Sequence, residues 1–205
     1  EYKIIDGVTA ARTEASVFAV KGGEFIAVAG GSDGTKLVNE IMYFKYSGSS
    51  FAQVNQAQPP RLADPGRRAA GVVGFGSGDE QLLMLGGYSD VTTVKPLNTS
   101  EIVNTSTGVV SAGPAVGSRG DTCVAKLKDG SILTIGGRTV EAANGPSKSD
   151  ATTVIIRPNG MGGTAVSNGP ELASGRFFHT CTTLLDGTVL VTGGVKETLS
   201  GAQEV

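Results

Sequence analysis

The chain has 205 residues and a formal net charge of −2, without a run of like charges, so it lacks the basic field that binding to nucleic acid requires. Its 31 glycines accompany many valines, isoleucines and threonines and no tryptophan, a balance typical of short strands joined by tight turns, which predicts an all-β fold. No apolar stretch reaches the roughly 18 residues that a membrane helix needs, so we expect no membrane span.

The chain opens with a strand-like segment, 1–7, and then repeats one unit four times. Each unit contains an arginine and, 17 or 18 residues later, a Gly-Gly pair that closes an apolar run. Two markers at one spacing, found four times, indicate an internal repeat of about 50 residues. The arginines are Arg12, Arg68, Arg119 and Arg176, and the pairs are Gly30-Gly31, Gly86-Gly87, Gly136-Gly137 and Gly193-Gly194.

Each unit predicts short antiparallel strands. Two strands joined by a tight turn lie between the arginine and the glycine pair, because Asp-Gly turns such as 129–130 and 186–187 tolerate the positive φ of a hairpin. The other two units place 21–23 and 76–79 at this turn. A polar loop and a third strand follow the glycine pair, at 40–44, 101–104 and 153–156, and a weaker fourth strand comes next, as at 109–111. Four strands per unit match a propeller blade.

From Arg176 to Gly194 the sequence follows the pattern Arg-x-x-His-Thr-x-x-x-Leu-x-Asp-Gly and ends its next strand in Gly-Gly. This pattern resembles the kelch repeats of the galactose oxidase-like β-propeller family, and the likeness covers nearly the whole chain. The resemblance implies one all-β domain, a β-propeller of kelch-type four-stranded blades. The four blades are expected at about 12–61, 68–117, 119–174, and 176–205 together with 1–11.

The two ends of the chain carry complementary parts of a blade. The fourth unit stops before its third strand, whereas segment 1–7 is a third strand without a unit of its own. Two arrangements remain open. In one, the N-terminal strand closes a four-bladed ring and removes free sheet edges; in the other, the four blades belong to a larger ring.

The sequence holds few groups suited to catalysis. His179 is the only histidine, so it is the single candidate base of a catalytic triad, and its place in the repeat favours a structural role. No Lys-Ser or Lys-Thr follows a glycine pair, so the pairs are expected to give backbone room and not to hold phosphate. The copper-radical oxidases of the family need two histidines, which this chain does not have. We therefore predict no catalytic residue, no metal site and no cofactor.

The repeated arginines and the two cysteines are assigned to the scaffold. The arginines are expected to pair with carboxylates or carbonyls between blades, with an anion-binding ring of arginines as the alternative. Cys123 and Cys181 occupy equivalent inner-strand positions in successive units, so we expect them to lie near each other. Buried free thiols are the favoured state, and a disulfide between blades is the alternative.

The loops after the glycine pairs differ between units, and variable loops on a rigid scaffold commonly carry recognition. They predict a protein or glycan ligand bound on one face. Two aspartates in these loops also raise the alternative of a Ca²⁺ site, although they lack a spacing motif. The candidate ligand-binding residues are Ser32, Asp33, Lys36, Tyr88, Ser89, Asp90, Arg138, Glu141, Lys196 and Glu197.

Two sequons, at Asn98 and Asn104, suit a glycosylated protein outside the cell. The expected function is therefore that of a non-catalytic binding module, extracellular or on the cell surface. Two alternatives remain open: a segment of a larger secreted propeller enzyme, and a structural subunit of an extracellular assembly. Both a homo-oligomer and a larger parent chain are compatible with the sequence.

Overall fold

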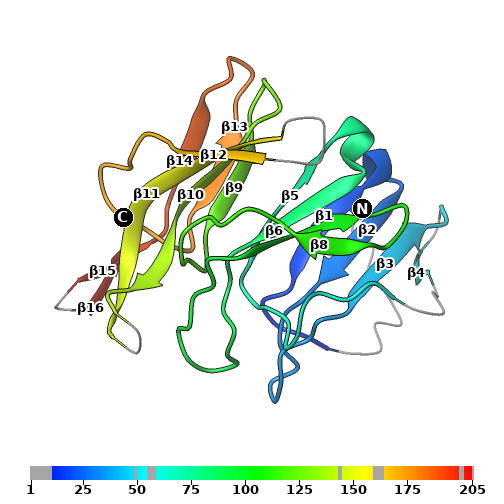
Figure 1. The fold of residues 1–205 in the computed structure, drawn as a ribbon, viewed down its shortest axis with the longest axis horizontal. Coiled ribbons are helices and arrows are strands. Elements are labelled where there is room, and N and C mark those ends of the chain that lie inside the picture. Colours follow the sequence, from blue (N-terminus) through cyan, green and yellow to red (C-terminus); the bar gives the residue numbers. More distant parts are fainter. Residues whose placement is uncertain are drawn as a thin grey trace.

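A computed structural model describes residues 11–48, 50–54, 59–142, 145–158, 164–198 and 201–204, and these residues form antiparallel sheets connected by turns (Figure 1). Three sheets have four strands each, paired in chain order. The first holds β1 (Ser16–Val20), β2 (Phe25–Ala29), β3 (Ile41–Tyr46) and β4 (Phe51–Gln53). The second holds β5 (Gly71–Phe75), β6 (Gln81–Leu85), β7 (Ser100–Asn104) and β8 (Val110–Ala112). The third holds β9 (Cys123–Lys126), β10 (Ile132–Val140), β11 (Ser147–Pro158) and β12 (Thr164–Asn168).

The fourth unit is built differently. Strand β13 (Thr180–Thr183) pairs with β14 (Val189–Thr192), and a separate hairpin joins β15 (Val195–Thr198) to β16 (Gly201–Glu204). This second hairpin was not predicted. The N-terminal strand expected at 1–7 lies outside the described residues. Within the described part of the chain, no helix is both long and apolar enough to span a membrane.

The all-β prediction is confirmed, and the four-strand groups are consistent with a β-propeller-like fold. The inner strands follow one another, β1 against β5, β5 against β9, and β9 against β13. Figure 1 shows the first sheet, in blue and cyan, on the right of this row and the fourth, in orange and red, on the left. The predicted turns between first and second strands are present, two of them as the short 3-10 turns η1 (Lys21–Gly23) and η2 (Ser77–Asp79).

The hydrophobic core lies between neighbouring sheets, because successive side chains of a strand point to opposite faces. Strand β6 shows this alternation. Leu82 and Met84 pack with the first sheet, whereas Leu83 and Leu85 pack with residues of the third, such as Ile132. All five side chains are at most 1% exposed. The second sheet therefore packs against both the first and the third sheet.

Each of the first three sheets contains an arginine that joins two of its strands at the same point, buried in the second and third units and half-buried in the first. Its Nη1 donates to the carbonyl of the first glycine of its own unit and to a carbonyl of the third strand or of the residue just before it. In the second unit this residue is Arg67, which donates to Gly86 O at 2.8 Å and Thr99 O at 3.0 Å. The repeat placed Arg68 at this position, but the residue that occupies it is the neighbouring Arg67. The sequence spacing alone did not separate two adjacent arginines.

The carbonyl of the same arginine reaches the preceding sheet. Gly31 N donates to Arg67 O at 2.8 Å, and Gly87 N donates to Arg119 O at 2.8 Å. The glycine pairs have positive φ values, and in the first three pairs a Cβ on the first glycine would collide with that carbonyl, whereas nothing lies within 4 Å of such a Cβ at Gly193. The pairs therefore provide backbone room, as predicted. Because one residue bonds to two sheets, we call it the arginine clamp.

Two of the clamps also form buried ion pairs. Arg67 Nη2 lies 2.6 Å from Glu101 Oε2, and the two side chains are 4% and 7% exposed. Arg119 Nη2 lies 3.3 Å from Asp150 Oδ2. The repeated arginines were expected to pair with carboxylates or carbonyls between blades. The clamp side chains instead bond within their own unit, whereas Arg68 does pair with a carboxylate of the neighbouring unit, that of Glu14.

The two cysteines form a disulfide, so the prediction of free thiols was wrong. Cys123 on β9 and Cys181 on β13 occupy the equivalent positions that the repeat predicted, with a Cα–Cα distance of 6.0 Å. This separation is within the range that a disulfide spans. The packing of β9 against β13 brings the cysteines together, and the bond links the third and fourth units covalently.

Candidate binding face at the inner-strand ends

The entry to each inner strand lies beside the residue that follows the glycine pair of the same unit. Isolated bridges join Thr13 to Ser32, Arg68 to Tyr88, Gly120 to Arg138, and Phe177 to Val195. Antiparallel pairing causes this arrangement, because the second strand ends where the first begins. The predicted loops and the inner-strand entries therefore share one end of the sheets, which we call the inner-strand face.

One residue per unit on this face has a left-handed backbone without being glycine. These residues come two positions after the clamp arginine, with φ values of 54° at Glu14, 51° at Ala69, 51° at Asp121 and 56° at Phe178. Side chains seldom adopt this conformation, and it gathers at functional sites. Ala69 N donates to Glu14 O at 2.9 Å, and Asp121 N donates to Ala69 O at 3.0 Å, so three of the four are linked in series.

These four positions were not predicted, because a glutamate, an alanine, an aspartate and a phenylalanine do not share one residue type that would mark a repeat. Their common feature in the sequence is their position, two residues after the clamp arginine. Because Arg68 was taken for the clamp in the second unit, this position was displaced by one residue there. Glu14 is 44% exposed and Phe178 is 63% exposed, whereas Ala69 and Asp121 are half-buried. The face therefore presents the carboxylate of Glu14, the short side chain of Ala69, the carboxyl group of Asp121 and the aromatic ring of Phe178.

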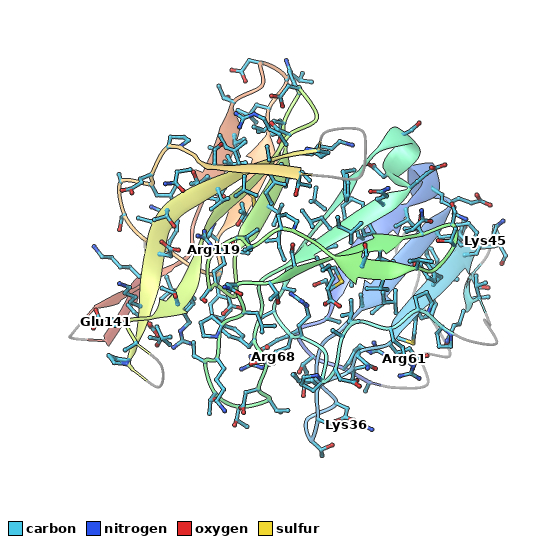
Figure 2. All side chains as sticks on the ribbon, in the orientation of Figure 1. Lys36, Lys45, Arg61, Arg68, Arg119 and Glu141 are labelled. Carbon is cyan, nitrogen blue, oxygen red and sulfur yellow. A yellow bond between two sulfur atoms is a disulfide. The ribbon has the colours of Figure 1, made fainter. Side chains whose placement is uncertain are left out.

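A buried cluster of Arg68 and Tyr88 contacts two members of this series, Glu14 and Asp121. The hydroxyl of Tyr88 donates to Asp121 Oδ2 at 2.6 Å, and the Cζ of Arg68 lies 4.7 Å from the centre of the Tyr88 ring. Arg68 also donates to Glu14 Oε2 at 2.5 Å. Figure 2 places Arg68 near the middle of the row of sheets, in the lower part of the view. Tyr88 is 1% exposed, so this predicted contact residue orients Asp121 and does not reach a ligand itself.

Burial controls the protonation of this pair. It raises the pKa of the Tyr88 phenol, and the charge of Asp121 raises that pKa further, so the hydroxyl remains a donor. Burial also raises the pKa of the Asp121 carboxyl, against the lowering effect of the hydrogen bond from Tyr88. The pair presents a carboxyl group held in one orientation.

A second cluster lies where the third and fourth units meet. The guanidinium of Arg138 sits 5.0 Å from the ring centre of Phe177, and it pairs with the carboxylate of Glu197. Arg138 also donates to Ser147 Oγ at 3.0 Å. The ring of Phe177 lies 5.0 Å from that of Phe178. Arg138 and Glu197 are thus brought together as a pair beside the buried ring of Phe177, which in turn contacts the exposed ring of Phe178.

The other loop candidates divide into turn-forming and exposed residues. Ser32 is 3% exposed, and Asp33 Oδ1 accepts three hydrogen bonds from Thr35 and Lys36. These bonds lower the pKa of Asp33 to about 2, which suits a turn cap. Asp90 caps its own loop in the same way. We assign these aspartates to loop structure, and the described residues contain no group of three metal-ligating side chains.

The remaining candidates lie further from the series. Figure 2 places Lys36 at the tip of its loop and Glu141 at the edge of the third unit, and both are exposed. Lys196 is exposed as well. Ser89 borders an open cavity of about 500 Å³ between the loops of the second and third units. The structure therefore does not bring these four residues into one site.

The sequons and the histidine were also singled out by sequence. Asn98 is exposed, whereas the Oδ1 of Asn104 accepts backbone hydrogen bonds from Ser106 and Thr107, so Asn98 is the better placed acceptor for a glycan. His179 is 7% exposed, and burial lowers its pKa. A neutral, enclosed ring fits the scaffold role expected for it.

Comparison with known proteins supports the fold alone. No family model and no curated protein matches the chain. Among solved structures, 157 chains match. One of them, titled "Structure of YjhT", superposes with a TM-score of 0.70 at 11% sequence identity, over 97% of this chain and 70% of that chain. The chain thus shares a common all-β architecture with a protein whose sequence is almost entirely different.

Proposed function

We propose that this chain is a non-catalytic binding module of the kelch-propeller type, and that it recognises a protein or glycan ligand at the inner-strand face. The observation that carries the proposal is the left-handed series. Four equivalent backbone positions hold Glu14, Ala69, Asp121 and Phe178. The backbone conformation is the same in all four units, whereas the side chain differs. Variable side chains on a rigid, repeated scaffold are typical of recognition surfaces.

The chemistry of these side chains suits hydroxyl and amide groups. Carboxylates accept hydrogen bonds from such groups, and charge-assisted hydrogen bonds are about twice as strong as neutral ones. The exposed Phe178 ring offers an apolar face for a sugar ring or an aliphatic side chain. The disulfide supports a location outside the cell, because such bonds persist in oxidising compartments.

The proposal is tested by screening the chain on glycan arrays and by affinity capture from extracellular fractions, followed by titration of the ligand found. Phe178→Ala and Glu14→Gln should each weaken binding at least tenfold. Leu185→Ala is the matched control, because Leu185 is 97% exposed but lies in the turn between β13 and β14, at the opposite end of the sheet. A ligand whose affinity is unchanged by Phe178→Ala and Glu14→Gln would refute this face.

A further inference from the structure

The outer edge of β14 lacks the neighbour that its counterparts have. In the first three sheets the second strands β2, β6 and β10 are hydrogen-bonded on both sides, to a first and a third strand. Among the described residues, β14 pairs with β13 alone. Such an edge presents unpaired N–H and C=O groups that favour the addition of another strand.

The side chains of β14 that face the third sheet are less enclosed than their equivalents. Val189 and Val191 are half-buried. At the same positions in β6, Leu82 and Met84 are at most 1% exposed, and Ile132 in β10 is fully buried. The third sheet is present beside Val189 and Val191. Their greater exposure therefore results from the lack of a strand next to β14.

An apolar cavity lies at this place. It has a volume of about 330 Å³, and its lining includes Leu133, Ile135, Ile155, Leu172, Val189 and Val191. At the preceding interface, side chains of a third strand fill the equivalent space. Val154 and Ile156 of β11 pack there against the second sheet. A third strand beside β14 would bring alternate apolar side chains into the cavity.

The clamp of the fourth unit lacks one of its acceptors. In the first three units the clamp Nη1 donates to a carbonyl of the third strand or of the residue just before it, at Glu40 O (3.1 Å), Thr99 O (3.0 Å) and Thr152 O (3.2 Å). Arg176 Nη1 donates to Gly193 O at 2.9 Å, and no third-strand carbonyl accepts from it within the described part of the chain. The guanidinium is therefore placed to receive a strand.

We propose that β14 is a docking edge for an extended antiparallel strand, and that the strand is segment 1–6 of a second copy of this chain. The segment has a glutamate followed by the strand-forming residues Tyr2, Ile4 and Ile5, and strand-forming residues likewise follow Glu40 and Glu101 in the first two third strands.

The segment belongs to a second copy because of where the first and fourth sheets lie. These two sheets are at opposite ends of the row (Figure 1). Asp6 and Arg12 are six positions apart, which spans about 20 Å when extended, so segment 1–6 reaches only an edge that lies close to its own first sheet. The β14 edge of another copy, placed beside the first sheet, meets this condition, and the exchange is independent of the inner-strand face.

The test measures the mass of the full chain over a range of concentrations by light scattering. We expect a species of at least twice the 20.7 kDa chain mass. A variant without residues 1–10 and the variant Ile4→Pro should both be monomers, because proline removes a strand N–H. Ile4→Val, which keeps a strand-forming residue, should associate like the original. Circular dichroism confirms that each variant keeps its β-structure.

A labelled peptide of residues 1–10 provides the second measurement. It should bind the variant without residues 1–10, and Leu172→Asp, which places a charge in the cavity lining, should weaken that binding more than tenfold. A full chain that stays monomeric at every concentration would overturn the proposal. So would association that survives removal of residues 1–10, or a folded variant that does not bind the peptide.

Discussion

Replacing Arg67 should destabilise the fold far more than replacing its neighbour Arg68. Without Arg67, the Glu101 carboxylate, only 7% exposed, loses its cation, and the carbonyls of Gly86 and Thr99 lose a donor. Removing one member of a buried ion pair typically costs about 3–5 kcal/mol. Arg68 is also buried, but its partners are a carboxylate that is 44% exposed and the loop carbonyls of Asp90 and Thr93. Water can hydrate these groups when Arg68 is removed, so the removal should cost about 1–2 kcal/mol.

Urea denaturation followed by circular dichroism measures this difference, through the midpoint at constant m-value. The pair Arg67→Ala and Arg68→Ala forms the comparison. If Arg67→Ala does not fold, Arg67→Lys keeps the charge but loses the fork geometry and should still be less stable than Arg68→Lys. Replacing both Arg67 and Glu101 with apolar residues should recover part of the loss. An equal or larger cost at Arg68 would refute the clamp assignment.

Three other perturbations test separate parts of the fold. Cys181→Ser should lower the free energy of unfolding by about 4 kcal/mol, as expected for a disulfide that closes a loop of 58 residues, and reduced original protein should match it in urea denaturation; no effect of reductant would contradict this. Because burial lowers the pKa of His179 in the folded state, the unfolded chain binds more protons below about pH 6.5, so stability should fall as the pH drops from there towards the folded pKa. His179→Gln should flatten that slope in denaturation at several pH values, and an unchanged slope would assign it to other groups. Gly86 and Gly78 share a φ near 60°, but a Cβ meets the Arg119 carbonyl only at Gly86, so thermal melting of Gly86→Ala should show a clearly larger loss than the roughly 1–2 kcal/mol of Gly78→Ala, and equal losses would contradict the close approach.

The recurring architecture was accessible from sequence because it depends on residues with a single physical role. Glycine pairs mark a positive φ beside a neighbouring backbone, and Asp-Gly marks a tight turn, so their spacing located the strands of each unit. The choice between Arg67 and Arg68 was not accessible, because it depends on which guanidinium points into the sheet. The disulfide required the packing of β9 against β13, which the repeat predicted only as proximity.

Most of the candidate site could not be read from the chain, because loop sequences do not show which polar groups serve the loop itself. Asp33 and Asp90 looked available and are used as turn caps. Tyr88 was correctly placed on the face, but its side chain is buried beneath it. Conversely, Phe178 is an unspecified position of the repeat pattern, directly before the histidine, and nothing in the sequence shows that its side chain is 63% exposed.

The four left-handed positions hold residues other than glycine, at a conformational cost. A non-glycine residue in this conformation costs about 1–2 kcal/mol, and glycine would remove the cost. The chain uses glycine at 31 positions, yet at none of these four. A purely architectural position would favour glycine in every unit, as the glycine pairs do. Glu14, Asp121 and Phe178 are not glycine and differ from one another, which supports the proposed binding role of the inner-strand face. The clamps beside them hold the strained backbone in place.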